Sequence, residues 1–97
     1  MIQVIVFAPG KPGELREIDN TLEALQEVVG GYIEQVYLAP DLVVLCNEEG
    51  RLQGLPANRW GLVGTFLVAR TDGEEYASLT NSDHAAIITL IRTGAPS

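Results

Sequence analysis

Short runs of β-branched and aromatic residues recur along the chain, and such runs predict the strands of a sheet. The two most apolar runs are residues 2–8, IQVIVFA, and residues 62–70, LVGTFLVAR. The shorter runs that predict further strands are residues 14–18, 32–38, 41–47, 51–53 and 75–78. Because a strand that is apolar along its whole length is typical of a sheet interior, we expect residues 62–70 near the centre of the sheet.

Residues 22–29 repeat apolar side chains at spacings of three and four, which indicates a helix with one apolar face. Asn20 is expected to cap its first turn, and Glu23 is expected to complete a capping box. Gly30 is expected to end the helix in the left-handed conformation that glycine adopts readily.

Residues 81–92 form a second segment with helical spacing. The segment follows Thr80, the expected N-cap, and Asp83 stands at the third position of the cap. Upstream of this helix, Asp72-Gly73 is a strong signal for a two-residue hairpin.

Strands joined by turn-rich segments, together with two helices, predict an α+β fold. We expect a mostly antiparallel sheet of five or six strands with both helices packed on one face. The 97 residues are close to the usual size of one domain, and no linker or repeat divides them. Residues 1–97 are therefore expected to form a single domain.

Six basic residues face thirteen acidic ones, which gives the chain a net charge of −7. Phosphate backbones repel such a protein at long range, so general DNA or RNA binding is not expected. Binding of a basic partner, or a binding site that concentrates a few arginines locally, is compatible with this charge. Lys11 is the only lysine, and its surroundings, PGKPG, lack the longer spacing of a phosphate-binding loop and are expected to join two strands. No apolar run approaches the roughly 18–20 residues that span a membrane, and no basic leader opens the chain, so we expect a cytoplasmic protein without membrane contact.

The residue types that most often carry catalysis or bind metals are few in this chain. Cys46 lies in an apolar run and is expected to be a small buried side chain, whereas His84 is expected to face solvent, so they do not predict a nucleophile with its base. One cysteine and one histidine are too few for a structural zinc site. Glu48 and Glu49 are neighbours in a predicted turn and point apart, as exposed turn residues do. We therefore expect no catalytic residues, no metal and no cofactor.

Tyr32 and Glu34 are expected to share one face of the strand at residues 32–38 with apolar neighbours. A glutamate among apolar side chains is costly unless it lies at a sheet edge or has a cationic partner. Arg59 or Arg51 would be the natural partner, and such a pair could be purely structural.

The stretch GLPANRW, residues 54–60, contains the only tryptophan and the strongest binding signal in the chain. Asn58 can bind an amide or a base edge, Arg59 can hold a phosphate or carboxylate through two hydrogen bonds, and Trp60 offers a flat surface for stacking. In the alternative interpretation the stretch is structural. Pro56 then shapes a turn, Asn58 bonds to the backbone, and Trp60 fills the gap between the sheet and the loop.

Four stretches stand together as a set, namely GGYIEQVYL, LCNEEGRLQGLPANR, GTFLVAR and SLTNSD. They resemble the uncharacterised family called domain of unknown function 3846, over nearly the whole chain, although the spacer between Arg59 and Gly64 is short for that family. The resemblance implies a small accessory protein of the kind met on phages, plasmids and related mobile elements, and it implies no catalytic residues. It also implies a constellation that recurs in the family, formed by Tyr32, Glu34, Asn47, Asn58 and Arg59.

We therefore expect a non-enzymatic binding protein that sequesters a small anionic ligand, such as a nucleotide-derived host signal, and so counters a host defence. The alternative is an acidic protein-interaction module, an inhibitor or DNA mimic that acts on a host protein. Exposed sheet edges and a small core favour a homodimer. The candidate ligand-binding residues are Tyr32, Glu34, Asn47, Gly54, Pro56, Asn58, Arg59 and Trp60.

Overall fold

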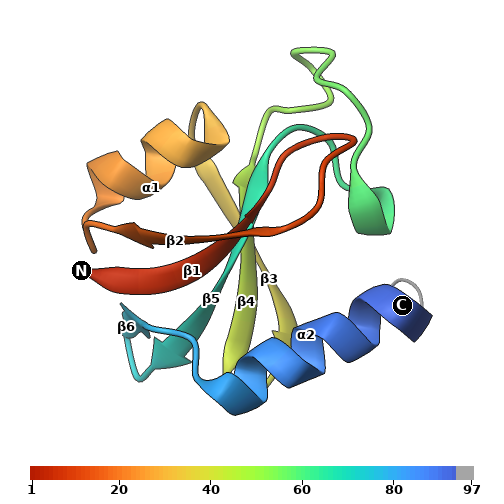
Figure 1. Ribbon diagram of the computed structural model, residues 1–97. Coiled ribbons are helices and arrows are strands. Elements are labelled where there is room, and N and C mark those ends of the chain that lie inside the picture. The colour runs from red at the N-terminus through yellow and green to blue at the C-terminus, as the bar shows by residue number, and fades with distance from the viewer. Residues whose placement is uncertain (94–97) are drawn as a thin grey trace.

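The computed structural model describes the backbone of residues 1–93 and the side chains of residues 1–91, and it shows a sheet with two α-helices (Figure 1). The strands are β1 (Ile2–Phe7), β2 (Glu14–Ile18), β3 (Ile33–Ala39), β4 (Leu42–Asn47), β5 (Phe66–Asp72) and β6 (Glu75–Ala77). The helices are α1 (Leu22–Val29), α2 (Asn81–Thr93) and the short 3₁₀ helix η1 (Arg59–Gly61). The six-stranded sheet has the order β2-β1-β5-β4-β3, β6 also pairs with β5, and every pairing is antiparallel. The predicted α+β class and antiparallel sheet are confirmed.

β5 lies at the centre of the sheet, and its first four residues, Phe66 to Ala69, are fully buried. The central position expected for this apolar run is correct, but the strand does not begin at residue 62. Gly64 has a φ of +73°, which lies outside the β region of a regular strand, and this residue interrupts the run. Residues 62–65 therefore belong to a loop, and the strand begins at Phe66.

The two α-helices lie on opposite faces of the sheet (Figure 1), although we expected both on one face. Val4 belongs to the core that contains Leu25 of α1, whereas its neighbour Ile5 belongs to the core that contains Ile87 of α2. The expectation was wrong because β4 and the buried part of β5 carry apolar side chains on both faces. A single helical layer covers one face only, so each face needs its own helix.

Both ends of α1 are fixed by residues next to them. Thr21 is the N-cap in place of the expected Asn20, because its Oγ1 accepts a hydrogen bond from the N–H of Ala24 at 3.2 Å. Asn20 instead donates from Nδ2 to the carbonyl oxygen of Tyr76 on β6 at 3.0 Å. Gly30 ends the helix with a φ of +80°, which confirms the predicted left-handed cap.

Residues 51–53 form turns, where we expected a short strand. The N–H of Gln53 donates to the carbonyl oxygen of Glu49 at 2.9 Å, and the N–H of Gly54 donates to that of Arg51 at 3.2 Å. These bonds satisfy the backbone within the segment, so it has no need of a neighbouring strand.

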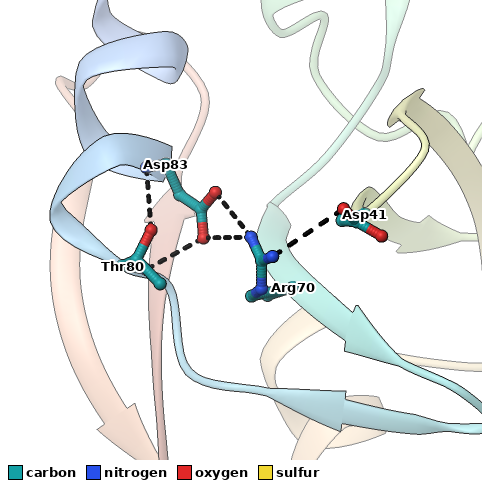
Figure 2. Close-up of polar contacts among 4 residues, drawn as sticks. All are labelled: Asp41, Arg70, Thr80 and Asp83. Atoms are coloured by element: carbon teal, nitrogen blue, oxygen red, sulfur yellow. Dashed lines mark hydrogen bonds and ion pairs between the residues drawn. The ribbon is translucent and has the colours of Figure 1, made fainter.

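The start of α2 has the predicted cap and is also tied to the sheet (Figure 2). The N–H of Asp83 donates to Oγ1 of Thr80 at 3.1 Å, and the N–H of Thr80 donates to Oδ2 of Asp83 at 2.9 Å. Nη1 of Arg70, on β5, donates to both oxygens of Asp83 at 2.9 and 3.1 Å. The beginning of the helix is thereby held against the central strand.

Candidate functional site

The loop between β4 and β5 closes on itself and holds most of the candidate residues. The N–H of Gly64 donates to the carbonyl oxygen of Pro56 at 2.7 Å, and the N–H of Asn58 donates to that of Leu62 at 2.8 Å. Gly54 has a φ of +68°, which lets the chain turn into this loop. Gly54 and Pro56 therefore contribute through the backbone.

Asn58 supports the loop from inside. Its Nδ2 donates to the carbonyl oxygen of Phe7 at 2.9 Å and to that of Gly64 at 2.7 Å. Its Oδ1 accepts from the N–H of Arg59 at 2.8 Å and so caps η1. Because both N–H groups of the amide are used within the protein, the structure favours the structural interpretation of this side chain.

Trp60 is the one non-glycine residue with a positive φ, at 59°, among the residues that the structure describes. That conformation costs about 1–2 kcal/mol for a residue other than glycine. The indole ring lies 5.9 Å from the ring of Phe7 and 5.6 Å from that of Phe66, centroid to centroid. Each such aromatic pair contributes about 0.5–1.5 kcal/mol beyond the burial of its area, so the packing offsets the backbone strain. Trp60 thus fills a gap beside the sheet, as the structural interpretation holds.

Arg59 has no carboxylate partner within the described part of the chain. The expected pair with Glu34 is not formed, because Glu34 lies on the edge strand β3 with its side chain in solvent. Arg51 does not pair with it either, since its Nη2 donates to the carbonyl oxygen of Gly61 at 2.7 Å. The guanidinium carbon of Arg59 instead lies 5.8 Å from the ring centroid of Phe7, a cation–π contact that orients it.

Arg59 lines an open pocket of about 530 Å³ together with Lys11, and we name it the Lys11–Arg59 pocket. The residues that line it are Gly10, Lys11, Pro12, Ala57, Asn58 and Arg59. Among the described residues, the lining contains two cationic side chains and no carboxylate, on a chain with more than twice as many acidic as basic residues. This pocket is therefore a local positive region on an acidic protein.

The β1–β2 hairpin turn places Lys11 in this pocket. Gly10 has a φ of +72°, and the N–H of Lys11 donates to the carbonyl oxygen of Ala8 at 3.1 Å. Pro9 followed by a glycine of positive φ is the sequence signature of a type II turn. The expectation that PGKPG joins two strands is confirmed, but the sequence did not indicate that Lys11 would stand beside Arg59.

Asn47 is a buried support of the same kind as Asn58. Its Nδ2 lies 3.3 Å from both the carbonyl oxygen of Val29 and Oε1 of Gln53, and its Oδ1 accepts from the N–H of Glu49 at 2.8 Å. These bonds tie the end of β4 to the end of α1 and to the turn that follows. We therefore assign Asn47 to the fold of the loop.

Two separate pockets contain four of the five residues of the recurring constellation. Glu34 and Asn47 line a pocket of about 300 Å³ between β3, β4 and the following loop, whereas Asn58 and Arg59 line the Lys11–Arg59 pocket. Tyr32 is exposed at the start of the sheet edge, and its carbonyl oxygen accepts from the N–H of Glu48 at 2.8 Å. Arg59 is the member of the set with a cationic group that faces solvent.

Cys46 has the properties of a buried structural cysteine. Its thiol lies 3.6 Å from the carbonyl oxygen of Glu34, and burial, with a smaller effect of the Glu34 charge, raises the pKa of the thiol. A raised pKa lowers the thiolate fraction, which is the opposite of what activates a cysteine nucleophile.

Within residues 1–91, no group of three or more His, Cys, Asp or Glu side chains is arranged to hold a metal ion. None of the described helices has both the length and the apolar character needed to cross a membrane.

A family model described as a domain of unknown function (DUF3846) matches residues 2–92 of the chain. No curated protein and no solved structure matches the chain at a significant level. The match covers the β4–β5 loop and both sheet edges, so the motif-based resemblance is confirmed in spite of the short spacer between Arg59 and Gly64.

Proposed function

The chain belongs to the family described as a domain of unknown function (DUF3846), a description that assigns no activity, and from the surface of this chain we propose that it is a non-enzymatic protein that binds a small anionic ligand in the Lys11–Arg59 pocket.

This proposal rests on one observation: the cationic side chains of Lys11 and Arg59 have no ion-pair or hydrogen-bond partner among the described residues. Among the side chains of residues 1–91, Arg70 and Arg16 form ion pairs, and Arg51 bonds to a backbone carbonyl. With the residues that the structure describes, Lys11 and Arg59 form neither an ion pair nor a hydrogen bond through their side chains. The two unpaired cations come from segments far apart in sequence, yet both line one pocket.

A phosphate group is the anion that best matches this pair. A guanidinium presents a planar fork that binds two phosphate oxygens at once, and an ammonium adds a compact charge beside it. The ring of Phe7 limits the positions of the Arg59 fork, which lowers the entropy lost on binding. The pocket is open to solvent, and its volume of about 530 Å³ lies within the usual range for small-molecule sites.

The biological role that we propose follows from the family resemblance. In a phage or mobile element, a small cytoplasmic protein that holds a nucleotide-derived host signal would lower its free concentration and so blunt a host defence. The ring of Trp60 is packed against Phe7 and Phe66, so recognition would come chiefly from the phosphate.

A titration with nucleotides tests the proposal. Isothermal titration with nucleoside monophosphates, diphosphates and cyclic nucleotides should find at least one that binds the wild-type protein. Arg59→Ala and Lys11→Ala should each weaken that binding by about tenfold or more, because each removes a charge-assisted contact. Arg16→Ala is the matched control, since it removes the same charge from β2, where Arg16 pairs with Glu14 at 3.5 Å. If no nucleotide binds, or if Arg16→Ala weakens binding as much as Arg59→Ala, the proposal is wrong.

The excess of acidic residues supports the second candidate, a module that binds a basic host protein. Four carboxylates, those of Glu14, Glu17, Asp19 and Glu27, line one open pocket of about 640 Å³ between β2 and α1, and the cations of Lys11 and Arg16 line the same pocket. A partner held by these charges should be captured less well as the salt concentration rises. Capture that is independent of salt would exclude this form of binding.

A further inference from the structure

The two edges of the sheet differ in how they are protected. β2, at one edge, has three charged residues among its five, whereas β3, at the other edge, has one charge, Glu34, among its seven and contains neither lysine nor proline. Natural sheets commonly protect their edges with charges, proline or a covering element. Tyr32 and Tyr37 beside the β3 edge are 66% and 62% exposed, and Val36 is 41% exposed. β3 is therefore the edge that is open to another strand.

The hydrogen bonds of β3 show which of its backbone groups point outward. The N–H of Glu48 donates to the carbonyl oxygen of Tyr32 at 2.8 Å, just before the Ile33–Asn47 pair that begins the β3–β4 ladder, so the carbonyl group of Tyr32 points toward β4. Hydrogen-bonded pairs alternate along an antiparallel ladder, so Glu34 and Val36 also bond to β4. The residues whose N–H and C=O groups point away from β4 are Ile33, Gln35 and Tyr37.

We propose that β3 pairs antiparallel with β3 of a second copy of this chain, across a two-fold axis at Gln35. In this register Ile33 of one copy faces Tyr37 of the other, and Gln35 faces Gln35. Each of these pairs exchanges both of its N–H···O=C bonds, so every outward backbone group from Ile33 to Tyr37 is satisfied. The regular edge ends there, because the register shifts between Tyr37 and Ala39. A register centred on another residue would leave part of the edge unpaired.

The side chains on this edge are compatible with self-pairing. On one face the apolar Ile33 meets the aromatic Tyr37, and on the other face Glu34 of each copy lies opposite Val36 of the other. No like charges stand directly opposite each other. Like charges in that position would destabilise the strand pair. β3 carries a single charged side chain, so self-pairing brings only the two Glu34 carboxylates, one from each copy, to the interface.

Sedimentation equilibrium across a dilution series tests the dimer. The wild-type chain should dimerise, and Tyr37→Lys should raise the dissociation constant by about tenfold or more, since the two-fold axis places two lysines at the interface. Leu15→Lys is the matched control, because Leu15 is an apolar residue of β2 that is 53% exposed on the opposite edge. It should leave the dissociation constant unchanged. Circular dichroism establishes that both variants are folded.

Amide hydrogen exchange provides a second measurement that does not depend on a substitution. The N–H groups of Ile33, Gln35 and Tyr37 should gain protection as the protein concentration rises, whereas those of Glu34 and Val36 should be protected at every concentration by their bonds to β4. A chain that is monomeric at all concentrations overturns the proposal. A dimer that Leu15→Lys dissociates as readily as Tyr37→Lys, or whose outward amides gain no protection, also overturns it.

Discussion

Arg70 connects the central strand β5 to the start of α2 through its ion pair with Asp83 (Figure 2). Its guanidinium lies 2.9 Å from the nearer oxygen of Asp83 and 3.7 Å from that of Asp41. Burial by itself raises the pKa of the Asp83 carboxyl, but hydrogen bonds from the backbone of Thr80 and from Arg70 outweigh it and hold the pKa of Asp83 below its ordinary value. The ionised carboxylate is therefore the form that the fold favours.

We predict that Asp83→Asn lowers the free energy of unfolding by about 2–3 kcal/mol at neutral pH. The substitution keeps the size of the side chain but removes its charge and turns an N–H group toward Arg70. Breaking a fully buried ion pair costs about 3–5 kcal/mol. The cost predicted here is smaller, because Arg70 retains access to water. Urea unfolding followed by circular dichroism measures the change.

Asp41→Asn is the matched control on the other side of Arg70. Asp41 is mostly exposed and its contact with Arg70 is longer, so its loss should cost at most about 1 kcal/mol. If Asp83→Asn stays within about 0.5 kcal/mol of the wild type, or if Asp41→Asn costs as much, Arg70 does not hold α2 in the way described.

The same pair has a defined pH dependence. Because the pKa of Asp83 is lower in the folded than in the unfolded protein, its stabilisation is fully present above the ordinary value near 3.8 and is lost as the pH falls through the folded-state pKa. The stability difference between wild type and Asp83→Asn should therefore be constant above that value and shrink below it. A difference that grows on acidification would contradict the assignment.

Two further predictions concern the β4–β5 loop and β4. Asn58→Ala should lower the free energy of unfolding measured in urea by about 2–3 kcal/mol, because the carbonyl oxygens of Phe7 and Gly64 lose their donor. Asn20→Ala removes a more exposed hydrogen bond to the carbonyl oxygen of Tyr76 and should cost less. Equal losses of stability would contradict the role given to Asn58. Cys46 should resist a thiol reagent in the folded protein and react fully in urea, and rapid labelling under native conditions would contradict its burial and raised pKa.

The sequence predicts the local structure well wherever residues within a single turn decide the outcome. Gly30 ends α1 as expected, and the Thr80–Asp83 pair caps α2, because both signals act within a single turn. The N-cap of α1 was misplaced by one residue because Asn20 and Thr21 both have capping side chains. A bond from Asn20 to the distant β6 decides between them, and that bond is a property of the folded chain.

Tertiary geometry limits the remaining predictions. The continuous apolar runs of β4 and β5 already indicated a sheet that is buried on both faces, and with that signal the helices would have been placed on opposite sides. The Lys11–Arg59 pocket could not be predicted, because it depends on how the β1–β2 hairpin lies against the β4–β5 loop. The sequence identified Arg59 as a candidate, but no local pattern connects it with Lys11.

The position of Trp60 gives the protein an intrinsic optical reporter. It is the sole tryptophan of the chain, it directly follows Arg59, and its indole packs on Phe7, the ring over which the Arg59 guanidinium lies. An anion bound to this guanidinium would add a negative charge close to the indole and change the electric field there, so the emission of the protein would shift without any attached dye. The binding proposed for the Lys11–Arg59 pocket could thus be tested by fluorescence in the unmodified chain.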